Sequence, residues 1–433
     1  MLGCGNVGGA VVRMLHEHAH DVERRAGSRI GVRRIAVRDV RKPRNLPVGA
    51  DVLTDDPAAV VRDPRIDIVV ELMGGVEPAL SLILEAFAAG KSVVTANKEL
   101  LSTRGGEVFD AASRAGVDVL YEASVGGGIP LIRPIREHLA GDRIVRFTGI
   151  VNGTTNYILT RMTEDGSTME GAVAEAQALG YAEADPTADV EGFDAAAKAA
   201  ILATIAFDVP VVAGDVYREG ITEVGADDIA FAKGLGYVVK FVAIAEALDD
   251  EVAVRVHPAM IPREHPLAAV RESFNAVFIE AEKVGPLMLY GRGAGGDPTA
   301  TSVVGDLIEL ARNTGSRGRL TSIGHSAHAR SPEEGGLGTA RRLKPIEELS
   351  AQYYILMRVA DRPGVLAAIA SAFAGHLVSI KSVWQEGFGD DAQIVLITHR
   401  AGEGALRSCV EDLRRLDAVN EVRSVIRVEA AQP

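Results

Sequence analysis

The stretch Gly3-Cys4-Gly5-Asn6-Val7-Gly8 has the spacing G-x-G-x-x-G and opens an apolar, helix-forming segment. Such glycines let a backbone approach a pyrophosphate, and the helix N-terminus favours the negative charge. The pattern alone is weak evidence, because it needs a preceding strand, and here only Met1 and Leu2 precede it. We expect the complete chain to carry about 5–10 further residues of first strand. Without them the middle of the sheet should have a gap.

The residues after this loop alternate between two patterns. Short β-branched runs at 31–37, 66–72, 91–96 and 117–122 alternate with alanine-rich segments near 7–18, 77–89 and 105–115. This alternation is typical of βαβ units with a parallel sheet. Residues 1–125 are therefore predicted to form a doubly wound, Rossmann-type domain of an α/β protein that binds a dinucleotide.

Two charged positions of this domain point to ligands. The second predicted strand ends at Arg38 beside Asp39. An arginine there accommodates the 2′-phosphate of NADP, whereas an acid favours NAD, so NADP is preferred and NAD stays open. Lys98 follows the strand at 91–96, where ligands bind in open α/β sheets.

The composition limits the class of protein. A chain of 433 residues is long for one hydrophobic core, so two or three domains are expected. A net charge of -13 argues against nucleic-acid binding or a basic membrane surface. The apolar runs are too short to span a membrane and no signal peptide is evident, which predicts a cytoplasmic protein. The two cysteines, Cys4 and Cys409, suggest neither a disulfide framework nor a zinc site.

Residues 126–315 have longer helices and mixed strands, which indicates an α+β substrate and dimerisation domain. Strands are predicted at 143–152, 251–260 and 275–282, and the stretch from Asn152 to Asn156 supplies capping residues for a helix. A second glycine-rich turn at 291–296 opens a helical pattern that runs to Ala311. It is either another backbone approach to a ligand or a simple tight turn.

The last part of the chain has its own order of elements. Residues 316–351 lack periodicity and are interpreted as an irregular connection. Residues 352–429 follow the order βαββαβ, which is typical of a ferredoxin-like domain. Asp361, Gly364 and Val365 lie in its first strand-to-helix turn.

The stretch GYAEADPTADVEGFDAAAKAAILATIAF, residues 180–207, combines five carboxylates, among them Glu183, Asp185 and Asp189, and one lysine with an apolar helix. Lys198 is the only ionisable group from 195 to 207, and a helix apolar on nearly all sides is normally buried. A buried lysine needs a partner, and Asp194 is one turn away. The alternative is an ordinary Asp194–Lys198 pair on the surface.

These motif sets together resemble the monofunctional homoserine dehydrogenases that carry a C-terminal ACT domain. The family motif D-x-x-G-x-D-x-x-x-K stands here from Asp189 to Lys198. The resemblance implies reversible, NAD(P)-dependent reduction of L-aspartate 4-semialdehyde to L-homoserine, on the route to threonine, methionine and isoleucine. Lys198 would be the general acid/base, because burial can lower the pKa of a lysine toward neutrality.

The resemblance also implies binding residues. Glu183, Asp189 and Asp194 would hold the substrate, with Asp194 and Lys198 meeting only through it. Lys98, beside both substrate and cofactor, and Asp194 would be catalytic together with Lys198. Cofactor contacts are expected at Gly3, Gly5, Asn6, Val7, Gly8, Arg38, Lys98, Gly180 and Gly295. A monovalent cation, sodium in the family, is expected at Glu122, Val125, Gly127 and Ile129.

The ACT domain implies regulation and assembly. The resemblance predicts an amino-acid effector, with L-threonine as the hypothesis, near Asp361, Gly364 and Val365, and a homodimer or homotetramer. An ACT pair that only holds subunits together is the simpler alternative. Two other functions stay open: another ACT-tailed amino-acid or hydroxy-acid dehydrogenase, and a non-catalytic amino-acid sensor.

Overall fold

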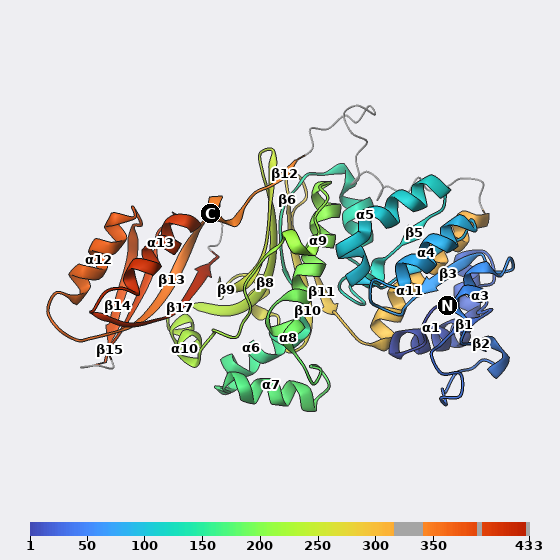
Figure 1. Cartoon of the computed structure of the whole chain (residues 1–433), viewed down its shortest axis with the longest axis horizontal. Coiled ribbons are helices and arrows are strands. Elements are labelled where there is room, and N and C mark those ends of the chain that lie inside the picture. The colour runs from blue at the N-terminus through green and yellow to red at the C-terminus, as the bar shows by residue number, and fades with distance from the viewer. Residues whose placement is uncertain (316–340, 388–391, 430–433) are drawn as a thin grey trace.

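A computed structural model describes residues 1–315, 341–387 and 392–429 of the chain. Three bodies lie in a row along the longest axis (Figure 1). The nucleotide-binding domain is at one end, the ACT domain is at the other, and a domain built on a large sheet lies between them. No helix of the described residues is both long and apolar enough to cross a bilayer.

The first domain is a parallel α/β sheet with helices around it. Its strands are β1 (Ile35–Ala36), β2 (Leu53–Thr54), β3 (Ile68–Glu71), β4 (Ser92–Thr95) and β5 (Val119–Leu120). Its helices are α1 (Asn6–Glu17), α2 (Ala19–Ala26), α3 (Pro57–Arg62), α4 (Ala79–Ala88) and α5 (Lys98–Ala115), with a short turn of helix, η1 (Ala50–Val52). β1 pairs with β2, and β4 lies between β3 and β5.

Met1 and Leu2 hold the centre of this sheet. Leu2 forms parallel bridges to Ala36 of β1 and to Glu71 of β3, and so joins the two halves. A cavity of about 320 Å³ lies beside Met1, and residues 28–34 and 65–68 are among its lining residues. β1 is shorter than the predicted strand at 31–37 because residues 31–34 border this cavity instead of a neighbouring strand.

The central domain is a sheet in the order β11-β10-β6-β8-β9 with helices packed on it. Its strands are β6 (Ile144–Ile150), β7 (Tyr217–Arg218), β8 (Tyr237–Leu248), β9 (Glu251–Pro262), β10 (Phe274–Ala281) and β11 (Gly285–Arg292). Its helices are α6 (Gly153–Asp165), α7 (Met169–Ala178), α8 (Thr187–Val190), α9 (Phe193–Phe207) and α10 (Ala226–Gly234). α9 packs against β8 and β9, which buries its apolar sides. Shorter helical turns are η2 (Glu122–Ser124), η3 (Pro134–His138), η4 (Leu139–Gly141), η5 (Ala213–Asp215) and η6 (Pro266–Ala269).

The long helix α11 (Gly296–Gly315) leaves the central domain and returns to the first (Figure 1). Val303 and Leu307 of α11 are buried in one cluster with Val11 and Val12 of α1. The sequence placed this helix in the second domain and ended it at Ala311. Its packing instead makes it part of the core of the nucleotide-binding domain, so it ties the two domains together.

The ACT domain follows the βαββαβ order of its sequence pattern. Its elements are β13 (Ser350–Val359), α12 (Val365–Gly375), β14 (Ile380–Glu386), β15 (Ala392–Thr398), α13 (Glu403–Leu413) and β17 (Val419–Val428). Short pieces are β12 (Arg342–Leu343), η9 (Ile346–Glu348) and β16 (Ala401–Gly402). Of the predicted connection at 316–351, residues 316–340 lie outside the described part of the chain.

The ACT sheet has the order β17-β13-β15-β14 and is continuous with the central sheet. Arg427 and Val428 of β17 pair in parallel with Ala259 and Met260 of β9. One sheet therefore runs from the central domain into the ACT domain, which gives the two a direct mechanical connection.

Candidate active site

The start of α9 holds the central group of polar side chains. Gly192 caps this helix with a φ of 83°, a left-handed conformation that glycine adopts readily. A Cβ atom on Gly192 would lie 2.9 Å from Cζ of Phe241, so space also requires glycine here. The tight turn at Gly192 starts the helix so that Asp194 lies in its first turn and Lys198 one turn later.

Two lysines share the carboxylate of Asp194. Nζ of Lys198 lies 2.7 Å from Oδ2 of Asp194 and donates to the carbonyl oxygen of Val151, also at 2.7 Å. Nζ of Lys98, at the start of α5, lies 2.5 Å from Oδ1 of Asp194. The expectation that Asp194 and Lys198 meet only through substrate is therefore wrong: they pair directly, and Lys98 joins them. The surface alternative is wrong too, since Lys198 is only 8% exposed.

The protonation of this group follows from its charges. Burial, reinforced by the charge of Lys98, lowers the pKa of Lys198, although the Asp194 carboxylate opposes that shift. The pKa of Lys98 is raised: burial opposes its charged form, but Asp194, Asp189 and Glu183 favour it more. Despite burial, the two lysines hold the pKa of Asp194 well below its usual range. Two ammonium groups compete for one carboxylate, and Lys198, the more deeply buried, is the one favoured to release its proton.

Asn152 completes the group, and sequence reasoning noted it only as a capping residue. Its Oδ1 does cap α6, accepting from the N–H of Thr155 at 2.8 Å. Its Nδ2 donates to Oδ1 of Asp189 at 2.6 Å and to Oδ2 of Asp194 at 2.8 Å. Asn152 thus orients both carboxylates. Its place at the end of the strand predicted at 143–152 was the signal available.

Of the remaining predicted substrate residues, Glu183 lies in the loop between α7 and α8, and Asp189 lies in α8. Glu183 is exposed, Asp189 is half-buried, and the side chain of Gln177 donates to the carbonyl oxygens of Glu183 and Ala184. Gly180 lies two residues after the end of α7 and has a left-handed φ of 76°. Glu183 and Asp189 both favour the charged form of Lys98 and so contribute to its raised pKa.

The first glycine loop has the close approaches of a nucleotide cradle. A Cβ on Gly3 would lie 2.7 Å from the carbonyl oxygen of Leu72, and one on Gly8 would lie 2.8 Å from that of Gly3. The second glycine turn meets the first, because a Cβ on Gly296 would lie 3.1 Å from the carbonyl oxygen of Asn6. Gly295 beside it has a φ of 118°. The second turn therefore lies against the first, and its approach to a ligand stays a prediction.

A basic cavity adjoins this loop. It has a volume of about 520 Å³, and Gly5, Asn6, Arg13, Lys42, Arg44 and Gly296 are among its lining residues. Val7 packs against the core of the domain, and Arg38 is exposed just beyond β1. Backbone without side chains fits a bound pyrophosphate, and the three cations beside it fit the charge of the pyrophosphate and of a further phosphate. The residues present therefore fit a dinucleotide.

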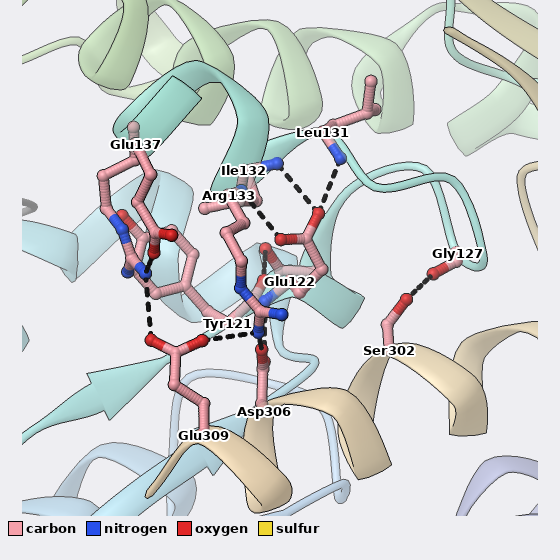
Figure 2. Close-up of polar contacts among 12 residues, drawn as sticks. Tyr121, Glu122, Gly127, Leu131, Ile132, Arg133, Glu137, Ser302, Asp306 and Glu309 are labelled. Carbon is pink, nitrogen blue, oxygen red and sulfur yellow. Dashed lines mark hydrogen bonds and ion pairs between the residues drawn. The ribbon is translucent and has the colours of Figure 1, made fainter. Parts of the chain in front are cut away.

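The turn predicted to hold a cation is tightly hydrogen-bonded. Figure 2 shows the Glu122 carboxylate accepting the backbone N–H groups of Leu131, Ile132 and Arg133, at 2.6, 2.9 and 2.8 Å. The hydroxyl of Ser302 on α11 donates to the carbonyl oxygen of Gly127 at 2.6 Å. A carboxylate has about four lone-pair positions, so roughly one remains on Glu122. No cluster of three or more His, Cys, Asp or Glu side chains suited to a metal occurs in the described residues.

The same turn is locked to α11 by charge (Figure 2). The N–H of Glu122 donates to Oδ2 of Asp306, and Arg133 bridges Asp306 and Glu309 at 2.8 and 2.7 Å. Burial and the nearby Glu122 carboxylate raise the pKa of Asp306 to about 8, with Arg133 acting against them. The contact between η2 and α11 holds Val125 and Ile129, which are both buried, in a fixed turn.

The predicted effector residues lie in the β13–α12 turn of the ACT domain. Gly364 has a φ of 94° and caps α12, whose first residue, Val365, is buried. Asp361 is exposed and accepts a hydrogen bond of 3.4 Å from the side chain of Gln385 on β14. The turn therefore lies against the outer strand of the sheet.

A dinucleotide cradle beside a paired lysine and carboxylate, followed by an ACT domain, defines a nicotinamide-dependent oxidoreductase with a regulatory tail. Family models agree with each part: residues 3–122 match the NAD binding domain of homoserine dehydrogenase, 130–308 match homoserine dehydrogenase, and 353–418 match the ACT domain. The chain belongs to the homoserine dehydrogenase family. It reduces L-aspartate 4-semialdehyde to L-homoserine, reversibly, with a nicotinamide cofactor.

Individual relatives support this assignment over the full length. The homoserine dehydrogenase of Mycobacterium tuberculosis is 50% identical over 99% of this chain and 97% of its own. The crystal structure of the enzyme from Thiobacillus denitrificans has a TM-score of 0.91 and 41% identity, over 99% of this chain and 97% of that one. A hyperthermophilic archaeal homoserine dehydrogenase in complex with NADPH has a TM-score of 0.60 and 28% identity, over 71% of this chain and 95% of that one.

Proposed function

We propose that Lys198 is the general acid/base of the homoserine dehydrogenase reaction. The observation that carries this proposal is that Lys198 and Lys98 share one carboxylate, Asp194, while Lys198 is the more buried of the two. Neutral Lys198 accepts the hydroxyl proton as homoserine is oxidised, and protonated Lys198 returns it when the aldehyde is reduced. When bound, the nicotinamide supplies or accepts the hydride.

The contacts of Lys198 leave it one position for the substrate. An ammonium has three N–H groups, and the Val151 carbonyl and the Asp194 carboxylate take two of them. The third, or the lone pair after deprotonation, points to the substrate hydroxyl. Lys98 stays charged, which suits it to hold the substrate carboxylate or to polarise the aldehyde oxygen.

The substrate ammonium is assigned to Glu183 and Asp189. Both oxygens of Asp194 already accept from lysine, whereas Glu183 is exposed beside the site. A carboxylate is the partner that an ammonium group requires. Asp194 therefore acts mainly by holding the two lysines, and its contact with the substrate is the smaller part of its role.

NADP is the cofactor that the basic cavity favours over NAD. Lys42 and Arg44 line it, and the guanidinium of Arg44 is held by the backbone oxygens of Asp39 and Lys42 at 2.8 and 3.0 Å. Arg38 lies next to Asp39 at the strand end. A relative is known in complex with NADPH. Arg44→Ala should raise KM for NADPH more than KM for NADH; equal effects would contradict a 2′-phosphate contact.

The ACT domain is proposed to bind L-threonine beside Gly364, at the contact between the β13–α12 turn and β14. Val383 and Trp384 of β14 are 40% and 38% exposed, which leaves apolar surface for a second subunit in a dimer or tetramer. Threonine should inhibit turnover and shift the sedimentation coefficient. Loss of inhibition in a Gly364→Val variant that still assembles would separate effector binding from assembly.

A sodium ion is proposed at the turn from Glu122 to Ile129, held by the remaining Glu122 position and by the carbonyl oxygens of Val125, Gly127 and Ile129. Hard cations prefer such oxygen ligands. Initial rates in sodium, potassium and choline chloride at equal ionic strength test it. Equal rates in all three salts would remove the cation from the proposal.

The assignment of Lys198 is tested with purified protein, L-homoserine and NADP, following NADPH absorbance across pH. Lys198→Ala should lower turnover by orders of magnitude but keep NADPH binding, whereas normal turnover would remove Lys198 from its role. A chain that never turns over homoserine but changes assembly with threonine would favour an amino-acid sensor instead.

The protein is expected to act in the cytoplasm.

A further inference from the structure

The segment from Tyr217 to Thr222, here called the bridging segment, lies between the ACT domain and the start of α9. It includes β7, which pairs in parallel with β9, and the N–H of Glu219 continues that ladder by donating to the carbonyl oxygen of Val256. In extended chain, successive side chains point to opposite faces. Odd and even positions of the segment should therefore contact different neighbours.

The odd face contacts the ACT domain. Arg427 of β17 lies 2.6 Å from Glu219, and its guanidinium also donates to the hydroxyl of Tyr217 at 3.3 Å. The same guanidinium pairs with Glu403 of α13 at 2.6 Å, and Glu403 accepts from the hydroxyl of Tyr353. Arg427 is only 3% exposed. Breaking one of the ion pairs of Arg427 would leave a buried charge without a partner. Tyr217 and Glu219 must therefore move with the ACT domain.

The even face contacts the loop that begins α9. The guanidinium carbon of Arg218 lies 3.6 Å from the ring centre of Phe193, a residue that is 50% exposed. A Cβ on Gly192 would lie 3.1 Å from Cγ of Arg218, and one on Gly220 would lie 2.5 Å from the carbonyl oxygen of Val190. The segment and this loop are in close contact along their length.

Further hydrogen bonds tie the segment to the same loop. The N–H of Ile221 donates to the carbonyl oxygen of Val190 at 2.8 Å, and the hydroxyl of Thr222 donates to the Glu191 carboxylate at 3.3 Å. Asp194, which holds both active-site lysines, follows Phe193 directly. A shift of Arg218 would therefore be passed to Asp194 over a single residue.

We propose that Arg218 is a positioning residue for Asp194 and Lys198, and that the bridging segment connects it to Arg427 of the ACT domain. This inference rests on the roles proposed above for Asp194 and Lys198. The ACT domain acts on the site by moving Glu219 and Tyr217, and Arg218 passes the movement to Phe193. Coupling of this kind is established only by measuring it, so a double-mutant cycle is the appropriate test.

The kinetic test uses Arg218→Ala and Glu219→Gln in the full chain. Arg218→Ala should raise KM for L-homoserine roughly 3- to 20-fold and shift the pH profile of kcat/KM, and Arg218→Lys should restore part of the loss because lysine also stacks on a ring. Glu219→Gln should act in the same direction. The double variant should be no worse than Arg218→Ala, since the connection is already cut.

Glu251→Gln is the matched control. Glu251 pairs with Lys344 at 2.6 Å on the chain that leads into the ACT domain, but the bridging segment is not part of that pair. Its effect should be small, and it should add to that of Arg218→Ala. If the effects of Arg218→Ala and Glu219→Gln on KM were also fully additive, the inference would be overturned.

Hydrogen–deuterium exchange gives a readout that does not need turnover. Amides of residues 190–198 should exchange faster in Glu219→Gln than in the parent protein, and should be unchanged in Glu251→Gln. Unchanged exchange in Glu219→Gln would overturn the connection even if the kinetics moved. If no variant and no parent protein oxidises homoserine, the proposed function fails, and exchange at 190–198 alone decides this inference.

Discussion

Lys198 and Lys240 are both buried lysines, and only one of them has the surroundings of a catalytic group. Lys240 on β8 is 2% exposed and donates to Oδ1 of Asn156 at 3.1 Å and to the carbonyl oxygen of Val270. Burial lowers its pKa to about 8. Among the ion pairs of the described residues, none includes Lys240, whereas Lys198 faces Asp194 and, beyond it, Lys98. Burial alone therefore does not make a catalytic lysine: a shared carboxylate beside an acidic, open loop does.

The two lysines are linked through one short stretch of sequence. Asn152 and Asn156 stand at the two ends of the segment that opens α6. Asn152 orients the Asp194 that pairs with Lys198, and Asn156 accepts from Lys240. The same helix start thus serves a catalytic and a structural lysine, which makes matched substitutions at the two positions informative.

The largest expected difference is in turnover after truncation of each amine. Lys198→Met should lower kcat by about 10²- to 10⁴-fold, because a general acid/base contributes that much. Lys240→Met should leave kcat unchanged within error. Initial rates of homoserine oxidation measure both, with NADPH fluorescence titration as the check on cofactor binding. Equal losses in the two variants would show that burial, and not the shared carboxylate, matters.

A smaller effect is expected when the shared carboxylate is neutralised. Asp194→Asn should lower kcat/KM by roughly 10²-fold, since it removes the anion that both lysines use. The pKa of Lys198 should fall further, because its charged form loses its favourable partner. The pH dependence of kcat for homoserine oxidation should move to lower pH accordingly.

Asp189→Asn is the control for that substitution, since Asp189 shares the amide of Asn152 but pairs with neither lysine. It should mainly raise KM for homoserine. An unmoved pH profile in Asp194→Asn, or the same shift in Asp189→Asn, would contradict the shared-carboxylate account.

The smallest expected effect is a pH dependence of stability from Lys240. Its pKa is about 8 in the fold and near the ordinary 10.5 when unfolded. Between those values the unfolded chain binds the proton that the native state has lost, so stability rises with pH by up to about 1.4 kcal/mol per unit. Urea unfolding of the parent and of Lys240→Met on both sides of this window measures it. A slope unchanged by the substitution would show that Lys240 stays charged in the fold.

The sequence predicted elements well where a local pattern decides them. The ACT strands and helices are such elements, because their alternation and length are set within short segments. β1 shows the opposite case: residues 31–34 have strand composition, but a strand needs a partner, and these residues border a cavity instead. Likewise, the docking of α11 on α1 depends on contacts between distant segments, which periodicity cannot assign.

The site was predictable in its charges but not in its hydrogen bonds. The lone lysine of an apolar helix and the carboxylates before it were visible in the sequence, as were the two glycine turns. Lys98 contacts the same carboxylate because of the way α5 packs against α9, which a local pattern does not show. Asn152 orients two acids because of the position of the strand before it. Arg218 went unnoticed because a lone arginine carries no pattern.

The pairing of β17 with β9 also limits how copies of this chain can assemble. It uses one edge of the ACT sheet, so the joined sheet ends at β14 on one side and at β11 on the other. If two copies add through the same edge, a twofold axis closes the pair and growth stops. If β14 of one copy met β11 of the next, the contact would repeat without end and give fibres. In this fold, the strand edges that meet between copies therefore determine whether the assembly is a finite particle or a polymer.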